Sequence, residues 1–471
     1  MNKYRKLLTD TGLFVVSNFA SKLLIFLLLP LYTNVLSTEE YAVADLITTT
    51  INLTFPVLTL SITEATLRFA FDKNVKKNEV LSSSVMFIVI STIVVICVKP
   101  LVAGISSTLY QYWGYFIVCF FFTAAHNTLS YFSRGCDKTK VFAVSGIVHS
   151  VFLVGCNILF LLVFHWGLDG YLLSIIISYF ASAFYILMLA PFYKELLHFR
   201  LDVSLIKEML NYSIPMIPTI IAWWVMQTSD KYMIIWKLGL DQSGIYSVSY
   251  KIPSILTIVS SLFAQAWQIS AISNYGKKDN QSFVGNVYVF FNMVSVLSCA
   301  VLITSSEMLG KVLFAKDYFI AWKCVPVLLI AYVFSGLSGF LASNFTAAKK
   351  TKFLFVSTSI GAMINVLLNL FLIEKVGIIG AAYTTFIGFF VTWIMRLYVS
   401  QKLLKIDIPY IKHIIMYLIL VFDAVYMYNE FPLYYIVSII AFIALLAMNI
   451  NEIKRVVFTF TSILRKKIRA N

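Results

Sequence analysis

The chain has 471 residues, of which 60% are hydrophobic and 13% are charged. A soluble protein needs roughly 25% charged residues to cover its surface, so this composition excludes a soluble globular fold. The formal net charge of +15 does not indicate a nucleic-acid partner, because the Lys and Arg residues stand between apolar blocks, in the pattern of a membrane protein.

The apolar residues are grouped in blocks of about twenty, the length of helix that crosses roughly 30 Å of hydrocarbon. They predict an all-α membrane protein with about 14 transmembrane helices. The seventh and eighth spans are interrupted by polar residues. In chain order, the predicted spans are residues 11–35, 41–66, 80–101, 110–133, 141–164, 168–190, 209–235, 242–271, 282–305, 322–345, 353–373, 377–399, 411–428 and 431–449.

The remaining sequence signals argue against processing and against cofactor chemistry. The N-terminal MNKYRK leads directly into the first span without a small-residue cleavage site, so we expect no removable signal peptide. The six cysteines form no CxxC pattern and lie mostly within spans, which supports neither a disulfide framework nor a zinc site. We therefore expect no metal and no cofactor.

Basic residues are distributed unevenly between alternate loops. With the N-terminus in the cytoplasm, most of the 37 Lys and Arg fall on the cytoplasmic side, and the outer loops 36–40, 102–109, 165–169 and 429–430 hold none. This bias predicts an even number of spans, both termini in the cytoplasm and a multi-pass protein of the cell (inner) membrane. Arg134 and Arg396 are interpreted as cytoplasmic anchors.

Two parts of the chain resemble each other. Residues 36–43 (LSTEEYAV) resemble residues 238–245 (LGLDQSGI) at an offset of 202, and KTK at 138–140 recurs at 350–352. Six spans separate the copies, so both have the same orientation, as in a parallel repeat about an axis along the membrane normal. We predict a six-helix lobe at 1–200, a second at 201–405, and two extra helices with a basic tail at 406–471.

Five short motifs follow one another in a defined order. They are EATLRF at 64–69, YSIPMIP at 212–218, DKYMII at 230–235, GIYSVSYKIP at 244–253 and GIIGAAYTT at 377–385. Together they resemble the polysaccharide-export branch of the multidrug/oligosaccharidyl-lipid/polysaccharide exporter superfamily, and within it the O-antigen and capsule repeat-unit flippases (Wzx type). Lys231 departs from the family, which more often carries Arg there; Lys keeps the charge but lacks the planar fork that contacts a phosphate at two points.

This resemblance implies a two-lobed bundle whose central cavity opens alternately to either side. The implied protein is a flippase and not an enzyme. It carries undecaprenyl-diphosphate-linked oligosaccharide to the periplasmic or outer leaflet for O-antigen, capsule or exopolysaccharide synthesis. The implied partners are that lipid-linked oligosaccharide and membrane lipid, with a polysaccharide polymerase and chain-length proteins as further candidates and no nucleic acid.

Ionisable side chains deep in a membrane are costly and usually face a cavity or a partner. Lys22 lies roughly 17 Å into the first span and Lys251 roughly 14 Å into the eighth, close to the bilayer centre. We predict that both line the transport cavity and attract the diphosphate; a buried ion pair with a neighbouring helix is the alternative. The full set of candidate substrate-binding residues is Lys22, Lys251, Lys231, Asp230, Asn18 and Arg68.

Other polar residues within the spans have two interpretations each. Asp45, Glu64, His126 and His149 are candidates for ion coupling. For Asp45, an interfacial position near the outer surface is the alternative, as it is for Asp230 and Lys231. For Glu64 we favour a local salt bridge with Arg68, four residues away, and for the histidines a hydrogen-bonded place among helices.

Three further features have structural as well as functional interpretations. Pro215 and Pro218 favour a bend in the seventh span, which is a candidate gating element in a rocking transporter. The pair Asn365 and Asn369 either bridges helices or lines the cavity. Asp423, in the thirteenth span, is expected to contact the fourteenth helix or a partner protein.

Three other functions compete with the proposed flippase. A cation-coupled drug antiporter of the same superfamily would favour acidic rather than basic cavity residues. A lipid II-type flippase would be essential for growth. A membrane polysaccharide polymerase, which is an enzyme, typically has a large outer loop, whereas the longest outer loop here is the stretch 306–321.

Overall fold

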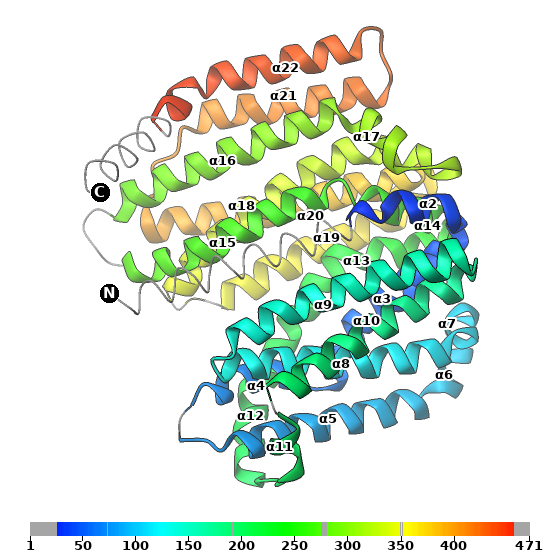
Figure 1. Cartoon of the computed structure of the whole chain (residues 1–471). Helices are drawn as coiled ribbons and strands as arrows, with labels where there is room; N and C mark the ends of the chain where they lie inside the picture. Colours follow the sequence, from blue (N-terminus) through cyan, green and yellow to red (C-terminus); the bar gives the residue numbers. More distant parts are fainter. Residues whose placement is uncertain are drawn as a thin grey trace, which may run out of the picture. The chain divides into compact units, whose positions relative to one another are not determined.

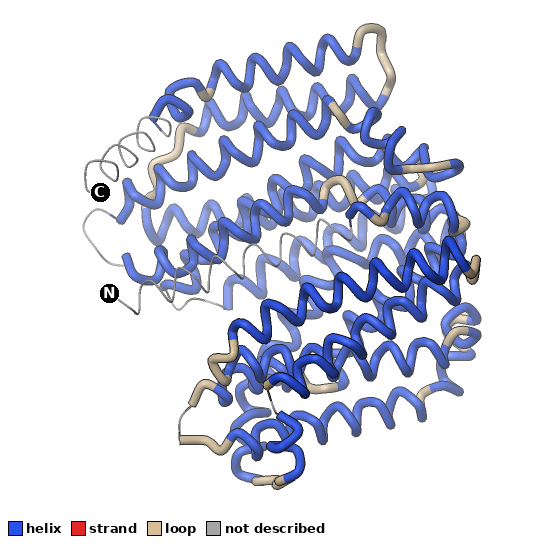
Figure 2. Tube along the Cα trace, viewed as in Figure 1, coloured by secondary structure: helices blue, strands red, loops and turns tan. Residues whose placement is uncertain are grey.

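The protein is described by a computed structural model that covers residues 26–455 except residues 73, 191, 275–279, 349 and 351. Every regular element of the described residues is a helix (Figures 1 and 2). Eleven of these helices are long and apolar enough to cross a membrane. The predicted all-α, multi-pass membrane fold is therefore confirmed.

The eleven helices coincide with eleven of the predicted spans. Of the other three, the first span lies mostly outside the described residues, and the last is the 15-residue helix α22 (Tyr434–Met448). The eighth span was predicted as one helix at 242–271 but is divided into α14 (Leu240–Ser249) and α15 (Ser254–Asn274). The second span is also divided, because Leu60 and Ser61 have positive φ angles.

The chain forms two compact units, which we describe separately. Unit 1 contains the described part of Met1–Ile235 together with Gly239–Ser247 and Ala315–Tyr318. At one end of this unit, apolar side chains of α4, α5, α8, α10 and α12 form a common core. The helices of unit 1 are α2 (Leu29–Val35), α3 (Thr38–Leu58), α4 (Ile62–Ala70), α5 (Lys77–Cys97), α6 (Lys99–Ala103), α7 (Ser107–Gln111), α8 (Trp113–Gly135), α9 (Thr139–Asn157) with its π-helical continuation Ile158–Val163, α10 (Gly167–Leu189), α11 (Phe192–Leu197), α12 (Val203–Ser213), α13 (Ile217–Leu238) without its last three residues, and most of α14.

Unit 2 contains Trp236–Leu238, Val248–Phe314 and the described part of Phe319–Asn471. Its most buried helix is α18 (Val325–Ala347), which packs against α15, α16, α20 and α21. The other α-helices of unit 2 are α15, α16 (Asn280–Thr304), α17 (Ser306–Leu313), α19 (Lys352–Val376), α20 (Ile378–Leu404), α21 (Tyr410–Tyr428) and α22. The lobes predicted from the repeat, 1–200 and 201–405, remain a prediction, because the two units are defined by packing and not by the repeat.

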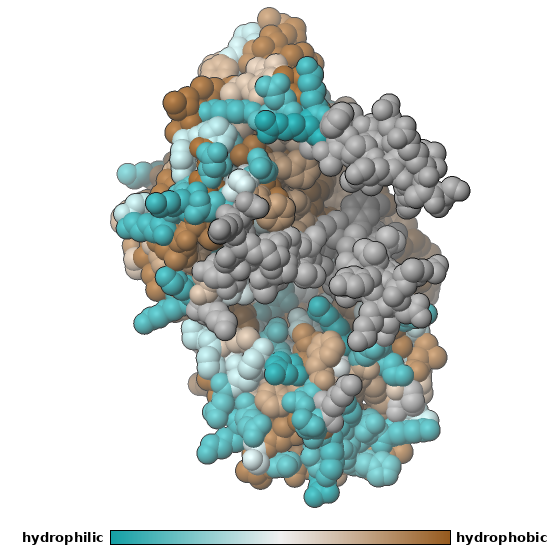
Figure 3. Space-filling model, turned by 90° about the vertical axis from the view of Figure 1, so that its left-hand side faces the viewer, coloured by the Kyte–Doolittle hydropathy of each residue, from teal (hydrophilic) through white to brown (hydrophobic). Residues whose placement is uncertain are grey.

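The surfaces of the helices suit a hydrocarbon environment. Large apolar side chains are exposed along α5 and α22, among them Ile90, Ile93, Ile439 and Ile443. Hydroxyl side chains within the spans donate to backbone carbonyls one turn earlier, so that they need no water; Thr54 Oγ1, for example, lies 2.8 Å from Thr50 O. Hydrophilic residues are abundant on the face that contains the α4–α5 and α8–α9 connections (Figure 3).

Candidate functional site: the Asp45–Lys231 cluster

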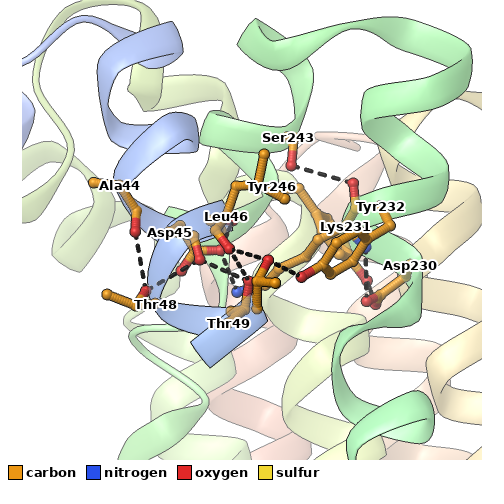
Figure 4. Close-up of polar contacts among 12 residues, drawn as sticks. Ala44, Asp45, Leu46, Thr48, Thr49, Asp230, Lys231, Tyr232, Ser243 and Tyr246 are labelled. Carbon is orange, nitrogen blue, oxygen red and sulfur yellow. Dashed lines mark hydrogen bonds and ion pairs between the residues drawn. The ribbon is translucent and has the colours of Figure 1, made fainter. Parts of the chain in front are cut away.

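An ion pair joins α3 to α13 within unit 1. Lys231 Nζ lies 2.8 Å from Asp45 Oδ2, and only 13% and 16% of the two side chains are exposed. The Ser247 hydroxyl of α14 donates to the same carboxylate oxygen at 2.9 Å. Three helices therefore meet at one carboxylate, and Figure 4 shows the α13 and α14 side chains beside α3.

Asp230, the neighbour of Lys231, is turned toward α14. Its side chain is fully buried and accepts a hydrogen bond from the Tyr246 hydroxyl at 2.7 Å. The backbone N–H of Lys231 donates to its other oxygen at 3.0 Å. Burial of a carboxylate is costly unless it is hydrogen-bonded, and these contacts reduce that cost. We call Asp45, Asp230, Lys231, Tyr246 and Ser247 the Asp45–Lys231 cluster.

Aromatic side chains extend the contact between α3 and α13 deeper along both helices. The Tyr232 hydroxyl lies 2.6 Å from Thr50 Oγ1, and the Trp224 indole N–H donates to Thr49 O at 2.9 Å. The two rings are also in contact, with their centroids 5.3 Å apart. The cluster is thus part of a continuous polar contact and not an isolated surface pair.

The start of α3 is in very close contact with α14. The Thr38 hydroxyl donates to Asp241 Oδ1 at 2.6 Å. A Cβ atom at Gly244 would lie 2.0 Å from Thr38 O, so only glycine permits this approach. The stretch Ala315–Tyr318 also reaches this end of α3, where the Tyr318 hydroxyl donates to Ser37 O at 2.6 Å. The loop charges predict that this end faces the outside.

Two of the positions that meet are separated by the offset of the predicted repeat. Asp45 and Ser247 are separated by 202 residues, the offset at which residues 36–43 resemble residues 238–245. Ala42 and Gly244 are related by the same offset. The sequence analysis placed Asp230 and Lys231 together among the candidate substrate-binding residues and Asp45 among the coupling candidates, but it missed Ser247 and Tyr246. The offset of 202 residues could have identified Ser247, because it relates Ser247 to Asp45.

The predicted cationic cavity is not tested by the described residues. Lys22 and Asn18 lie outside them. Lys251 is half-buried in the turn between α14 and α15, where its N–H donates to Val248 O at 3.0 Å and its carbonyl accepts from the Ser254 hydroxyl at 2.6 Å. Non-helical backbone at membrane depth is tolerated only where protein or water satisfies its polar groups. The helix break at Lys251 is therefore consistent with a position beside a cavity, and Lys251 remains a candidate substrate-binding residue.

The Glu64–Arg68 salt bridge that we favoured is not among the ion pairs of the described residues. Arg68 is exposed on α4, and Glu64 instead interacts electrostatically with Arg134 of α8. The physical reason is that α4 packs against α8, where Glu64 is partly buried beside Arg134, while Arg68 is at an exposed position of α4. Neither residue contacts the Asp45–Lys231 cluster through a described hydrogen bond or ion pair.

The two histidines lie together in the interior of unit 1. The ring centroids of His126 and His149 are 5.8 Å apart, and the Tyr179 ring lies 5.4 Å and 4.5 Å from them. One ring nitrogen of each histidine is buried without a hydrogen-bond partner. Their role in coupling remains a prediction.

The two prolines interrupt the helix of the seventh span. Pro215 lies in a three-residue 3₁₀ segment, Ile214–Met216, and Pro218 lies in the first turn of α13. Their role in gating remains a prediction.

Arg396 is not the cytoplasmic anchor that the sequence predicted, because its side chain is almost completely buried in unit 2. Its guanidinium donates to Ser338 of α18 and to Ser357 and Thr358 of α19 at 2.8–3.0 Å. It also donates to two backbone carbonyls. The hydroxyls and carbonyls around it satisfy its fork of donors, which is why a cation is accommodated there.

The asparagine pair and Asp423 bridge helices. Asn369 donates to Asn365 at 3.2 Å and accepts from the Thr384 hydroxyl at 2.6 Å, which ties α19 to α20. Asp423 of α21 accepts a hydrogen bond from Ser438 of α22 at 2.5 Å, the contact with the last helix that the sequence predicted.

Comparisons with known proteins agree with this architecture. The sequence family described as polysaccharide biosynthesis protein matches residues 7–269. In Methanocaldococcus jannaschii, the uncharacterized membrane protein MJ1068 is 26% identical over 38% of this chain and 34% of its own length. The uncharacterized membrane protein MJ1375 of the same organism is 24% identical over 55% of this chain and 65% of its own length. The chain thus spans about a third of the first relative and just under two thirds of the second.

Two solved structures have similar folds. The lipid II flippase MurJ in an inward closed conformation superposes with a TM-score of 0.72 at 14% identity, covering 95% of this chain and 99% of that one. The inward-facing conformation of a multidrug resistance MATE family transporter of the MOP superfamily superposes with a TM-score of 0.71 at 12% identity, covering 82% of this chain and 94% of that one. At these identities the likeness concerns the fold.

Proposed function

Because the chain belongs to the polysaccharide biosynthesis protein family, we propose that it is a flippase for undecaprenyl-diphosphate-linked oligosaccharide repeat units. It moves them from the cytoplasmic to the outer leaflet of the cell membrane, for O-antigen, capsule or exopolysaccharide synthesis. The fold that it shares with a lipid II flippase and a MATE transporter supports transport rather than catalysis.

The cargo sets the physical problem. A glycan carried through hydrocarbon would leave many hydroxyl groups without partners, and each would cost several kcal/mol. A hydrated passage removes this cost, basic side chains attract the diphosphate, and the polyprenyl tail stays in lipid. The passage must never be open to both sides at once, so each end needs a contact that can form and break.

The observation that carries the proposal is the Asp45–Lys231 cluster. It joins α3 to α14 at positions related by the repeat, and it consists of an ion pair and hydroxyl hydrogen bonds instead of an apolar core. Charged and polar groups of this kind can separate and bind water instead at a modest net cost in free energy. The reason is that the cost of removing them from water offsets most of the attraction between them. The cluster is therefore suited to close the outer ends of these helices in one state and to release them in another.

Reversible crosslinking tests this proposal. Thr38→Cys and Asp241→Cys, whose wild-type side chains touch, are introduced together after the six native cysteines have been replaced by alanine. The protein is reconstituted into liposomes with a fluorescent polyprenyl-diphosphate oligosaccharide. We expect translocation by the reduced protein, a fall to the protein-free rate after oxidation, and recovery with a reductant.

The matched control is the pair Thr66→Cys and Ser84→Cys, which replaces a 2.7 Å hydroxyl contact between α4 and α5; its oxidation should leave translocation intact. Absence of translocation by the reduced protein would refute the flippase. Translocation that continues through the Thr38–Asp241 crosslink would refute the opening of these helix ends.

The likeness to the MATE transporter favours a drug antiporter as a second candidate. Increased drug sensitivity of a deletion strain with normal surface polysaccharide would support this candidate. Growth arrest on depletion would instead support a lipid II-type flippase.

A further inference from the structure

The helix α21 in unit 2 carries a line of buried polar side chains. His413, Tyr417 and Asp423 are 4%, 7% and 1% exposed. His413 and Tyr417 are one turn apart on the same side of α21, whereas Asp423 is turned by about 120° from Tyr417 around the helix axis; all three are buried and extend over about 15 Å. Ionisable groups inside a membrane span are expensive and mark pathways for ions or substrates.

At the end of this line near residue 412, the polar residues reach the predicted cytoplasmic side. Lys412 Nζ lies 2.6 Å from Glu452 Oε1, and about a fifth of each side chain is exposed. The next residue, His413, has a buried Nε2 without a hydrogen-bond partner, and so has Glu452 Oε2. The His413 ring lies 6.0 Å from the Tyr288 ring of α16.

In the middle, one hydrogen bond joins α21 to α16 and a second joins α20 to α16, and together these bonds form a polar chain of contacts. The Tyr417 hydroxyl donates to Asn292 Oδ1 at 2.7 Å, and the Trp393 indole N–H donates to the Tyr288 hydroxyl at 2.9 Å. The amide nitrogen of Asn292 is buried and has no partner. Ser295, which is buried one turn further along α16, continues the polar face toward Asp423.

Asp423 lies on the far side of this chain. One of its carboxyl oxygens accepts the Ser438 hydroxyl, and the other is buried and has no partner. Cys299 of α16 is its electrostatic neighbour. Beyond it, the Ser306 hydroxyl contacts Met427 Sδ at 3.7 Å, and Glu307 of α17 binds Lys311, Tyr434 and Tyr435 at the predicted outer surface.

We call His413, Tyr417, Asn292, Asp423 and Ser438 the α21 seam. Its orphaned atoms argue against a purely structural role. A buried polar atom without a partner is costly, and a buried water molecule usually satisfies it. Arg396, in the same unit, provides the contrast of a buried polar group whose hydrogen bonds are made: its guanidinium donates to five acceptors.

We infer that the α21 seam is a hydrated proton path through unit 2, with Asp423 and His413 as its proton-binding groups. A proton that enters from the outer side adds to the Asp423 carboxylate, moves along water molecules that Asn292 and Tyr417 hold by hydrogen bonds, binds to His413 Nε2, and leaves beside Glu452. Each group releases the proton that it accepted, so nothing is oxidised or reduced. This inference concerns an activity separate from the cargo, and it holds whichever lipid the protein moves.

The titratable and charged groups that face the path come from four segments of the described chain. Cys299 and Tyr288 belong to α16, Lys412 and Tyr417 to α21, Glu307 to α17, and Glu452 follows α22. The helices α18 and α20 present Phe334 and Trp393 to Tyr417. Aromatic walls of this kind confine water to the seam.

Proton flux tests the inference without any cargo lipid. The full chain is reconstituted into phosphatidylethanolamine–phosphatidylglycerol liposomes that contain a pH-sensitive dye, and a potassium diffusion potential drives protons. We expect flux above that of protein-free liposomes and a loss of at least tenfold in Asp423→Asn and in His413→Gln. Asp407→Asn, the same chemical change at an exposed position before α21, should keep the wild-type rate.

A measurement on the unmodified protein covers the case in which a variant does not fold. A hydrophobic carbodiimide, which reacts with protonated carboxyl groups, should modify Asp423 and stop the flux in proportion. The inference is overturned if wild-type liposomes show no flux, if Asp423→Asn conducts like wild type, or if flux persists after Asp423 has been modified. Because no oligosaccharide is present, none of these results bears on the proposed flippase.

Discussion

Breaking the ion pair between α3 and α13 should open the outer ends of these helices. The variant Asp45→Asn leaves the Lys231 ammonium without its carboxylate in a site where only 13% of the lysine side chain is exposed. Removal of one partner costs 3–5 kcal/mol for a buried pair and about 0.2–1 kcal/mol for an exposed one. Ser247 can still donate to the new amide, so we expect a loss of about 2 kcal/mol, which shifts the equilibrium about 30-fold toward the open state.

Cysteine accessibility measures this shift. Thr49 lies one turn deeper in α3 than Asp45, and its hydroxyl donates to Asp45 O at 2.7 Å. In a background whose six native cysteines are replaced by alanine, Thr49→Cys should react with a membrane-impermeant maleimide from outside only after the cluster has opened. We expect the labelling rate to increase by up to about 30-fold in Asp45→Asn and in Lys231→Met.

The double variant Asp45→Asn with Lys231→Met should be labelled more slowly than the product of the two single effects predicts, because no charge remains unpaired. Lys311→Met is the matched control, since it breaks an i,i+4 pair whose lysine is 60% exposed and should change the rate less than threefold. Unchanged labelling in both single variants would show that the ion pair does not hold these helices together.

Three further predictions follow from other contacts. Gly244→Val should abolish transport in a complementation assay without lowering the protein level, because a Cβ atom at this position would overlap Thr38 O. Gly155→Ala adds a Cβ atom in open space and should be neutral in the same assay. Arg396→Met should lower the melting temperature in detergent, because it removes five buried hydrogen bonds that each contribute about 1 kcal/mol; a melting temperature equal to wild type would contradict this. Burial alone would raise the pKa of Glu307, but hydrogen bonds from Lys311, Tyr434 and Tyr435 lower it below its usual value. Its stabilising contribution is therefore present above the unfolded pKa of about 4.3 and lost as the pH falls through the folded pKa, so the melting temperatures of wild type and Glu307→Gln should differ at neutral pH and converge as the pH is lowered past the folded pKa.

The sequence by itself determined that the protein is helical and crosses the membrane many times. Apolar blocks of about twenty residues carry this information locally, because a span must satisfy its backbone hydrogen bonds within itself. The family could also be identified from short motifs in order. Both results depend on residues that are close together in the chain.

Within the spans, sequence reasoning predicted some contacts correctly. The contact of Asp423 with the last helix was predicted, because a carboxyl group in a span needs a polar partner and α22 follows directly. The breaks at 59–61 and 250–253 were missed, because the apolar residues on both sides of each break suggested one continuous span. The burial of Arg396 was missed because its acceptors belong to two other helices.

Only the tertiary structure decided which charges belong together. Asp45 and Lys231 are separated by 186 residues, and the sequence around either residue does not indicate that the other is its partner. The same holds for the seam, whose members come from α16, α21 and α22. Helix formation in a membrane is fixed by nearest neighbours along the chain, whereas ion pairing depends on how helices pack side by side, which hydropathy does not encode.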